Sequence, residues 1–308
     1  MILKMSILNT YKLKNNNLEV ILTNLGASVY QIYFHNKEML ATPKSLTDFI
    51  ENKQSFGRTV GRTAGRVFKN DETIKYIDFK NEEIIKHGGN NRLGEKYFDV
   101  LLHEKNKIVF NLKIDNNQDG FYGDLDLLIT YQLNDLNELI IKHEATSSKD
   151  SLLRLTFHPY FNLEQSNHLF NHSLQINTDY LLDMDKTGKF TDPISINKKN
   201  HNYLNARKLD INDNYNLDDI FVIENLEPCC ILSCNDISMS IKSNYDTLVV
   251  YTQNSVANHD LTNAKKGEKY ASIAIETQNA QNKLPLLKAN EKYDYYTIYS
   301  FKKNVSQN

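Results

Sequence analysis

The sequence predicts an all-β fold with many antiparallel strands. Segments in which apolar and polar residues alternate recur along the chain, as expected for strands with one buried face. These segments are rich in Tyr, Phe, Ile, Val and Thr, which favour strands. Helical patterns are scarce, and no regular alternation of strands with helices indicates a parallel sheet.

The expected strands are spread over the whole sequence. The segment 18–34 contains two of them, separated by a turn at Asn24-Leu25-Gly26. Others are expected at VFNLKI near 109, DLDLLITYQL near 124, ELIIKHEAT near 138, SLQINTDYLLDM near 173, ISMSIKS near 237, DTLVVYTQN near 246, ASIAIET near 271 and DYYTIYSF near 294. One short helix is expected in SLTDFIENK at 45–53, where Ser45 and Asp48 fit an N-terminal cap.

The composition is typical of a soluble globular protein. The chain has 308 residues, a formal net charge of -2 and 24% charged residues, and no shift in composition marks a linker. We therefore expect one domain over 1–308. The near-neutral charge argues against an electrostatic nucleic-acid partner. No stretch of about 18 apolar residues is present, which argues against a membrane helix.

The cysteine usage predicts a reducing compartment. Cys229, Cys230 and Cys234 are too few and too clustered for a disulfide framework. No histidine lies near them at zinc-ligand spacing, so we expect structural cysteines and no metal. The first residues, MILKMSILNTYKLK, lack the features of a signal peptide, so a cytoplasmic location is expected.

One unusual segment, FGRTVGRTAGRV at 56–67, repeats glycine and arginine at a spacing of four. A helix is rejected because the three glycines would each cost it roughly 1 kcal/mol. Glycines permit close backbone approach, and arginines supply rigid donor forks. Arg58, Arg62 and Arg66 are therefore a candidate site for an anion or a polyhydroxyl ligand; the alternative is a turn with solvated arginines.

Four further polar residues stand out by their surroundings. His87 precedes two glycines, and His158 lies among aromatic residues in FHPYFNL. Glu276 follows the apolar run ASIAI, where a pocket would raise its pKa toward that of a useful base. Asp218 precedes the strand-like IFVI. Each also has an ordinary alternative. These are a turn for His87, a core histidine for His158, a surface strand end for Glu276 and a solvated turn for Asp218.

Taken in order, these segments resemble the aldose 1-epimerase, or galactose mutarotase, family over roughly 18–300. The matching motifs are Asn24-Leu25-Gly26-Ala27, GRTAGR at 61–66, HGG at 87–89, HPYFNL at 158–163, Asp218 before a short strand, and ETQ at 276–278. The resemblance implies a large antiparallel β-sandwich, the galactose mutarotase-like supersandwich, with a sugar in an open cleft. It also implies Glu276 as general base and His158 as general acid, with the sugar bound by Arg66, His87, Asp218 and Gln278.

Three departures from the family pattern leave the preferred sugar open. Gly65 stands where the family often has Asn before its second arginine, and Pro159 stands where it often has Ser. A Trp is common downstream of the His-Gly-Gly, but this chain has none, so Phe98 or Tyr97 is the candidate replacement.

The expected reaction interconverts the α and β anomers of a free hexose such as galactose or glucose. A base removes the proton of the anomeric hydroxyl and an acid protonates the ring oxygen, so one base and one acid suffice. No redox step or carbanion arises, and neither a nicotinamide nor a metal cofactor is expected. The only partner expected is the small sugar, and the protein is expected to be a monomer or a homodimer.

Three other functions remain open on the sequence alone. A hexose-6-phosphate 1-epimerase would need extra basic residues, which Arg58, Arg62 and Arg66 could supply. A non-catalytic sugar-binding or regulatory protein is disfavoured by the presence of both His158 and Glu276. A polysaccharide lyase or hydrolase on a similar sandwich is the third; a hydrolase needs a carboxylate pair, for which only Glu276 and Asp218 are candidates.

Overall fold

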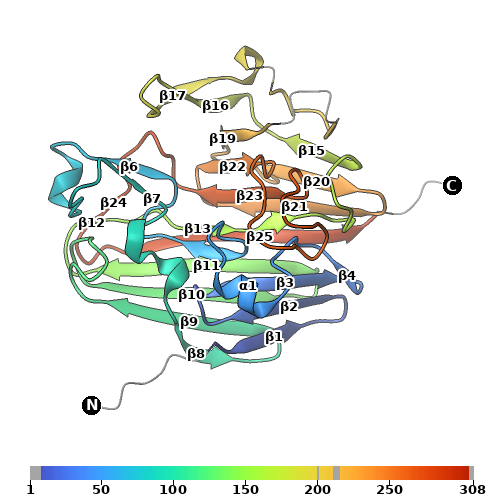
Figure 1. Ribbon diagram of the computed structural model, residues 1–308, viewed down its shortest axis with the longest axis horizontal. Coiled ribbons are helices and arrows are strands. Elements are labelled where there is room, and N and C mark those ends of the chain that lie inside the picture. The colour runs from blue at the N-terminus through green and yellow to red at the C-terminus, as the bar shows by residue number, and fades with distance from the viewer. Residues whose placement is uncertain (1–7, 200, 211–215, 305–308) are drawn as a thin grey trace.

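Three antiparallel sheets make up most of the protein (Figure 1). The computed structural model describes residues 8–199, 201–210 and 216–304. The largest sheet contains nine strands: β8 (Asp99–His103), β9 (Lys107–Ile114), β10 (Leu125–Leu133), β11 (Glu138–Ser147), β15 (His172–Ile176), β18 (Arg207–Lys208), β20 (Cys230–Cys234), β21 (Ile237–Ser243) and β25 (Tyr293–Lys303). Their order in space is β18-β15-β20-β21-β25-β11-β10-β9-β8.

Two smaller sheets complete the framework. One has six strands: β14 (Tyr160–Phe161), β16 (Tyr180–Met184), β17 (Phe190–Ser195), β19 (Asp218–Val222), β22 (Thr247–Tyr251) and β23 (Ile273–Gln278). They lie in the order β14-β23-β22-β19-β16-β17. The other has four strands in chain order: β1 (Thr10–Lys14), β2 (Leu18–Thr23), β3 (Ser28–Phe34) and β4 (Lys37–Glu38).

Three short strand pairs lie outside these sheets. They are β5 (Arg58–Val60) with β13 (Thr156–His158), β6 (Arg66–Phe68) with β7 (Ile84–Lys86), and β12 (Ser151–Leu152) with β24 (Leu286–Leu287). Four 3-10 turns also occur: η1 (Thr73–Lys75), η2 (Gly89–Asn91), η3 (Leu93–Glu95) and η4 (Ile196–Lys198). The first two pairs carry residues expected at the site, because β13 ends at His158 and β6 begins at Arg66.

One continuous apolar core joins the three large sheets. Alternate residues of β10, from Leu125 to Leu133, are buried, while the residues between them are partly exposed. Side chains from each sheet meet in this core, for example Val20, Leu127 and Ile275. In Figure 1 the six-stranded sheet lies toward the top and the four-stranded sheet toward the bottom. The predicted all-β sandwich is therefore confirmed.

Every segment expected to form a strand does so, but the boundaries change. SLQINTDYLLDM near 173 divides between β15 and β16, which belong to different sheets. The expected helix is α1 (Leu46–Ile50), and Ser45 Oγ accepts a hydrogen bond from the Asp48 N–H at 3.0 Å, which confirms the cap. In the described part of the chain, no helix is both long enough and apolar enough to cross a membrane.

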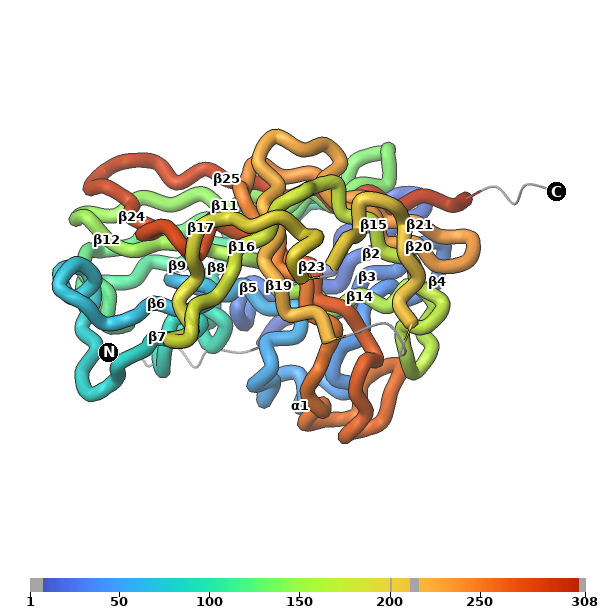
Figure 2. Tube along the Cα trace, turned by 90° about the horizontal axis from the view of Figure 1, so that it is seen from above, coloured from blue at the N-terminus to red at the C-terminus, as the bar shows by residue number. Residues whose placement is uncertain are grey.

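The segment around α1 packs beside the loop that follows β22 (Figure 2). The Lys44 N–H donates to Asp260 O at 2.9 Å, and the Asn258 N–H donates to Gln54 Oε1 at 2.9 Å. The two segments are far apart in sequence, so these contacts bring Lys53 and Ser255 to the edge of the same pocket.

Arg58 and Arg62 are buried structural residues, so both interpretations of them, a candidate ligand site and a turn with solvated arginines, are wrong. Arg58 is 3% exposed and donates to the carbonyl oxygens of Leu25, Phe49 and Ile50. Arg62 is 1% exposed, and its Nε lies 2.7 Å from Asp119 Oδ2. Apolar strands cannot satisfy buried loop carbonyls, and these guanidinium groups do so with several donors each. Only the third arginine of the segment, Arg66, faces a pocket.

The three cysteines are free and buried, as predicted. Cys229 and Cys230 are fully buried, and Cys234 is 3% exposed. Burial raises the pKa of the Cys229 thiol to about 12, so it stays protonated and unreactive at neutral pH. The cysteines act as small apolar residues in the core.

The Arg62–Asp119 ion pair gives a stability prediction. Arg62→Met leaves Asp119 charged and buried without its partner, so it should lower the free energy of unfolding by about 3–5 kcal/mol. Urea denaturation followed by circular dichroism measures the loss. The control is Lys69→Met, which breaks the exposed Lys69–Glu83 pair and should cost less than about 1 kcal/mol. Equal losses in the two variants would contradict the assignment.

Candidate active site

The outer face of the six-stranded sheet carries the polar floor of the candidate site. Every residue of β23 is buried, yet its side chains point alternately to two different environments. Ile273 and Ile275 enter the apolar core, whereas Glu276 and Gln278 face a pocket. Their neighbours on the pocket face of β22 and β19 follow from the strand register and are Val249, Tyr251, Ile220 and Asp218.

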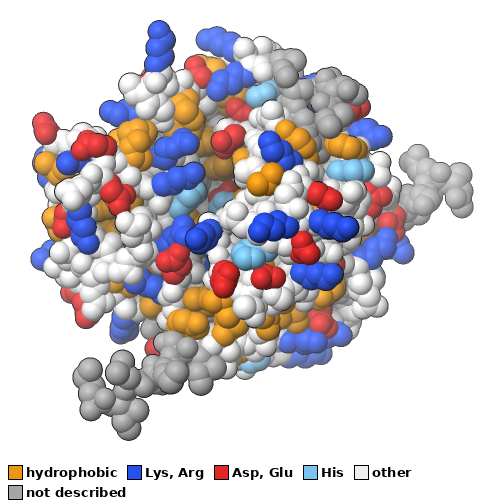
Figure 3. Space-filling model, viewed as in Figure 1, with side chains coloured by type: hydrophobic (Ala, Val, Ile, Leu, Met, Phe, Trp, Pro, Cys, Tyr) orange, Lys and Arg blue, Asp and Glu red, His pale blue; other side chains and the backbone are white. Residues whose placement is uncertain are grey.

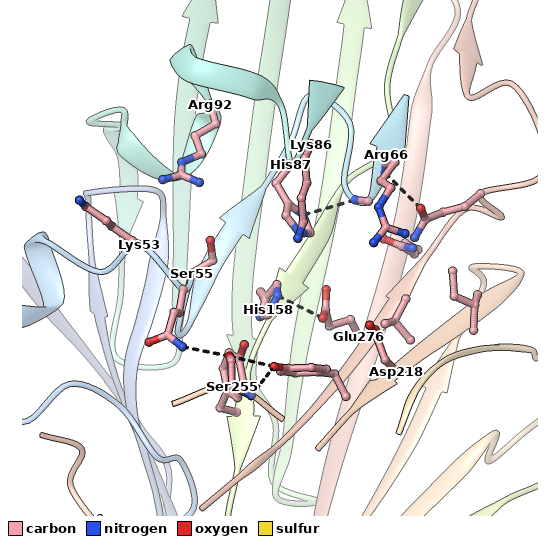
Figure 4. Close-up of a pocket in the computed structure, with 18 of the residues that line it drawn as sticks. Lys53, Ser55, Arg66, Lys86, His87, Arg92, His158, Asp218, Ser255 and Glu276 are labelled. Carbon is pink, nitrogen blue, oxygen red and sulfur yellow. Dashed lines mark hydrogen bonds and ion pairs between the residues drawn. The ribbon is translucent and has the colours of Figure 1, made fainter. Parts of the chain in front are cut away.

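Glu276 and His158 form a close acid–base pair at the centre of this pocket (Figure 4). His158 Nε2 lies 3.3 Å from Glu276 Oε1, and the two side chains are 9% and 5% exposed. The imidazole also packs against the Tyr160 ring, with ring centroids 5.1 Å apart. The sequence places these residues 118 positions apart, and the pairing of β14 with β23 brings them together.

Burial disfavours charge on both members of the pair. It raises the pKa of Glu276 well above its ordinary value, and the negative charge of Asp218 raises this pKa further. Burial lowers the pKa of His158 to about 4, and the charge of Lys86 also lowers it. The free site therefore favours a protonated carboxyl beside a neutral imidazole. In that state the pair holds one proton, within reach of both groups.

His87 is held beside the pair by a tight loop. Its Nδ1 accepts a hydrogen bond from the Gly65 N–H at 3.3 Å, so the proton of the neutral ring lies on Nε2. Burial lowers the pKa of His87 well below its ordinary value, and the nearby His158 lowers it further. The following residue must be glycine, because a Cβ at Gly88 would lie 1.9 Å from Gly61 O. His87 is therefore a neutral hydrogen-bond donor whose ring centroid lies 6.0 Å from that of His158.

Arg66, Asp218 and Gln278 complete the set expected from the sequence. Burial raises the pKa of Asp218, while the Arg66 guanidinium opposes this shift. Gln278 is 1% exposed, and its Nε2 has no hydrogen-bond partner in the described chain. All six residues expected from the sequence line a single pocket: Arg66, His87, His158, Asp218, Glu276 and Gln278.

The pocket has a volume of about 450 Å³ and opens to solvent. Figure 3 shows it as a hollow near the centre of one face, where histidine and acidic side chains gather beside Lys and Arg side chains. Sequence reasoning did not single out several lining residues: Lys53, Gln54, Ser55, Lys86, Arg92, Phe190, Tyr251, Ser255 and Gln281. Only Tyr251 had a signal, because it alternates with Val249 on the same strand face. Phe98, a candidate replacement for the missing Trp, is buried in the core, and neither it nor Tyr97 lines the pocket.

A second group of potential metal ligands lies outside the lining of this pocket. Atoms of Glu164, His172 and Cys234 lie within 4.8 Å of one another. However, His172 Nε2 accepts from the Leu163 N–H at 2.9 Å, and its Nδ1 lies 3.2 Å from Leu169 O. Both ring nitrogens therefore hold the adjoining loop, and the group is better explained as a structural contact than as a metal site.

A paired carboxyl and imidazole in an open polar pocket on a β-sandwich define an enzyme that transfers protons on a small polar substrate. The chain belongs to the aldose 1-epimerase family, whose family model matches residues 9–300. It is therefore an isomerase that interconverts the anomers of a hexose. The family, the enzyme class and the reaction expected from the sequence are confirmed.

Known relatives resemble the chain over most of its length. It is 27% identical over 275 residues to an aldose 1-epimerase from Haemophilus influenzae, with 80% of each chain covered. It is also 27% identical over 190 residues to a galactose mutarotase from Sus scrofa, covering 58% of this chain and 54% of that protein. The structure of an aldose epimerase homologue from C. elegans superposes with a TM-score of 0.86 at 24% identity, covering 97% of this chain and 100% of that one.

The charge coupling in the pocket gives a pH prediction. With one proton on the Glu276–His158 pair, kcat/KM should fall below about pH 4, where His158 gains a second proton, and again at high pH, where the pair loses its proton. The charge of Asp218 raises the pKa of Glu276, so Asp218→Asn should lower that pKa and move the alkaline limb to lower pH. The pH dependence of kcat/KM, measured by polarimetry, tests this.

The exposed Asp99 on β8 offers a matched control, because it does not line the pocket. Asp99→Asn should leave both limbs in place. An alkaline limb that stays unmoved in Asp218→Asn, or that moves equally in Asp99→Asn, would contradict the coupling between Asp218 and Glu276.

Proposed function

We propose that the pocket opens and recloses a free hexose, such as galactose or glucose, with Glu276 as general base and His158 as general acid. The observation that carries this proposal is the 3.3 Å contact between Glu276 Oε1 and His158 Nε2, two buried side chains in an open, polar pocket. The name of the Sus scrofa relative, a galactose mutarotase, supports galactose as the first sugar to test.

The reaction needs two proton transfers at one carbon atom. Glu276 takes the proton of the anomeric hydroxyl while His158 gives a proton to the ring oxygen. The bond between the anomeric carbon and the ring oxygen breaks, and a carbonyl group forms. Rotation about the bond between the first two carbons exposes the other face of the carbonyl, and reversed transfers close the ring. No proton is gained or lost overall.

The electrostatics of the pocket favour this cycle. Before ring opening, the shared proton moves from Glu276 to His158, and hydroxyl groups of the sugar stabilise the carboxylate as hydrogen-bond donors. Ring opening then leaves a protonated Glu276 and a neutral His158, which is the uncharged state that burial favours. In the proposal, Arg66, Asp218, Gln278 and the Nε2–H of His87 hold the sugar hydroxyls in place.

Replacing either member of the pair tests the assignment. Glu276→Gln and His158→Asn should each lower kcat about 10²–10⁴-fold, because each removes a proton-transfer group. The assay is polarimetry of freshly dissolved α-D-galactose, with glucose as the second sugar. Unchanged melting temperatures serve as the control for folding. Retained turnover in Glu276→Gln would refute the base assignment, and retained turnover in His158→Asn would point to His87 as the acid.

A phosphorylated hexose is the second candidate substrate, and it has its own structural support. Arg58 and Arg62 cannot bind a phosphate because both are buried in structural contacts. Besides Arg66, three cations line the pocket, namely Lys53, Lys86 and Arg92. In Figure 4, Lys53 and Arg92 lie across the pocket from Glu276 and Asp218. Arg92 is already paired with Glu95, so Lys53 is the cation placed to bind a charged group remote from the anomeric carbon.

Parallel assays separate the two substrates. If a hexose 6-phosphate is the substrate, Lys53→Met should raise its KM about 10-fold, because a hydrogen bond to a charged group is lost, and should leave KM for galactose unchanged. If a free hexose is the substrate, wild-type kcat/KM should be higher for galactose or glucose than for their 6-phosphates. A lower value for the free sugars would overturn the proposal in favour of the second candidate.

Other sequence-based expectations accompany this proposal. The enzyme acts as one domain over 1–308, as a monomer or a homodimer in the cytoplasm, without nucleic-acid or membrane partners. The near-neutral charge of the chain and its free, buried cysteines support the location and the absence of charged macromolecular partners.

A further inference from the structure

Gly65 is packed against the side chain of Gln281. Gly65 immediately precedes Arg66 and has a φ of 70°. A Cβ placed on it would lie 2.1 Å from Gln281 Oε1 and 2.4 Å from Gln281 Nε2. No side chain fits at residue 65 while the Gln281 carboxamide occupies this position.

The orientation of the Gln281 carboxamide is fixed by a backbone contact. Its Oε1 accepts a hydrogen bond from the Arg66 N–H at 3.1 Å, as the dashed line beside Arg66 in Figure 4 shows. The Nε2 group must therefore point the other way, and it has no hydrogen-bond partner among the described residues. Gln281 and Arg66 both line the pocket, so two donors lie side by side on one wall.

Buried Arg154 holds both sides of this wall together. It is 1% exposed, and its guanidinium donates to three carbonyl oxygens, those of Ala64, Arg66 and Ala280, at 2.8, 2.9 and 3.2 Å. The Arg154 guanidinium thus binds the backbone on both sides of Gly65 and the backbone just before Gln281. The backbone on both sides of the contact between Gly65 and Gln281 is therefore held in place, and the Arg66 N–H orients the Gln281 carboxamide.

We propose that Gln281 is a sugar-binding and specificity-determining residue, and that Gly65 leaves the space that admits it. This rests on the proposed sugar pocket. Gln281 Nε2 donates to a sugar hydroxyl next to the one bound by Arg66. Residue 65 has no side chain, and the Gln281 carboxamide fills the space beside it.

A double-mutant cycle tests the exchange of one carboxamide for another. Gln281→Ala should raise KM for galactose about 3- to 10-fold, the effect of one uncharged hydrogen bond, with kcat changed less than about 2-fold. Gly65→Asn should also raise KM, because its side chain collides with Gln281. Asn is the test residue at 65 because it tolerates a positive φ.

The combined variant makes the decisive measurement. In Gly65→Asn with Gln281→Ala, the Asn carboxamide has room, so KM should return to within about 3-fold of wild type and the melting temperature should recover. Asn282→Ala is the matched control, because Asn282 neighbours Gln281 but does not line this pocket. Its KM should stay within about 2-fold of wild type.

The outcomes separate this inference from the proposed function. An active wild type whose KM is unaffected by Gln281→Ala would overturn the inference and leave the proposed function intact. Effects of the two substitutions that simply multiply would overturn the exchange of carboxamides. A wild type that neither turns over nor binds galactose, glucose or their 6-phosphates, by polarimetry and calorimetry, would overturn both.

Discussion

The site depends on one constraint, the requirement that β23 be buried on both of its faces. One face must be apolar because it closes the core between the sheets, and the other can be polar because it forms the floor of a pocket. Glu276 and Gln278 lie on the polar face, two residues apart, as the strand period demands. The same constraint desolvates Glu276, and this desolvation gives the carboxyl its altered pKa. The burial of β23 therefore explains both its place in the fold and the raised pKa of Glu276.

The fold could be predicted from the sequence to the extent that strands are long enough to show their period. β10 and β11 have nine and ten residues and alternate almost perfectly, so they were found. β13 and β6 have three residues each, and β13 pairs with β5, which lies far away in the chain. No local pattern marks such strands. They nevertheless place His158 and Arg66.

The sequence predicted those residues of the candidate site that belong to motifs. It did not predict those that come from irregular loops. His158 and Glu276 stood out because a titratable group among apolar residues is unusual. Lys53 and Gln281 lie in irregular segments, and only tertiary contacts bring them to the pocket. The same limit explains the error at Arg62. Its spacing from Arg66 suggested a common role, but the chain turns between them, and Arg62 points to Asp119 instead.

The contacts of Arg154 also divide the pocket into walls of unequal rigidity. In the wall that carries Arg66 and Gln281, the buried Arg154 guanidinium binds both the start of β6 and the loop after β23. These two segments are therefore held together. The opposite wall, with Lys53 and Ser255, is held at its base by the backbone hydrogen bond between Lys44 and Asp260. Its rim is joined through exposed hydrogen bonds of Gln54, which exchange readily with water. A sugar therefore meets a fixed template on one side and an adaptable border on the other. Evolution can enlarge the range of accepted sugars at that border without disturbing the proton-transfer geometry.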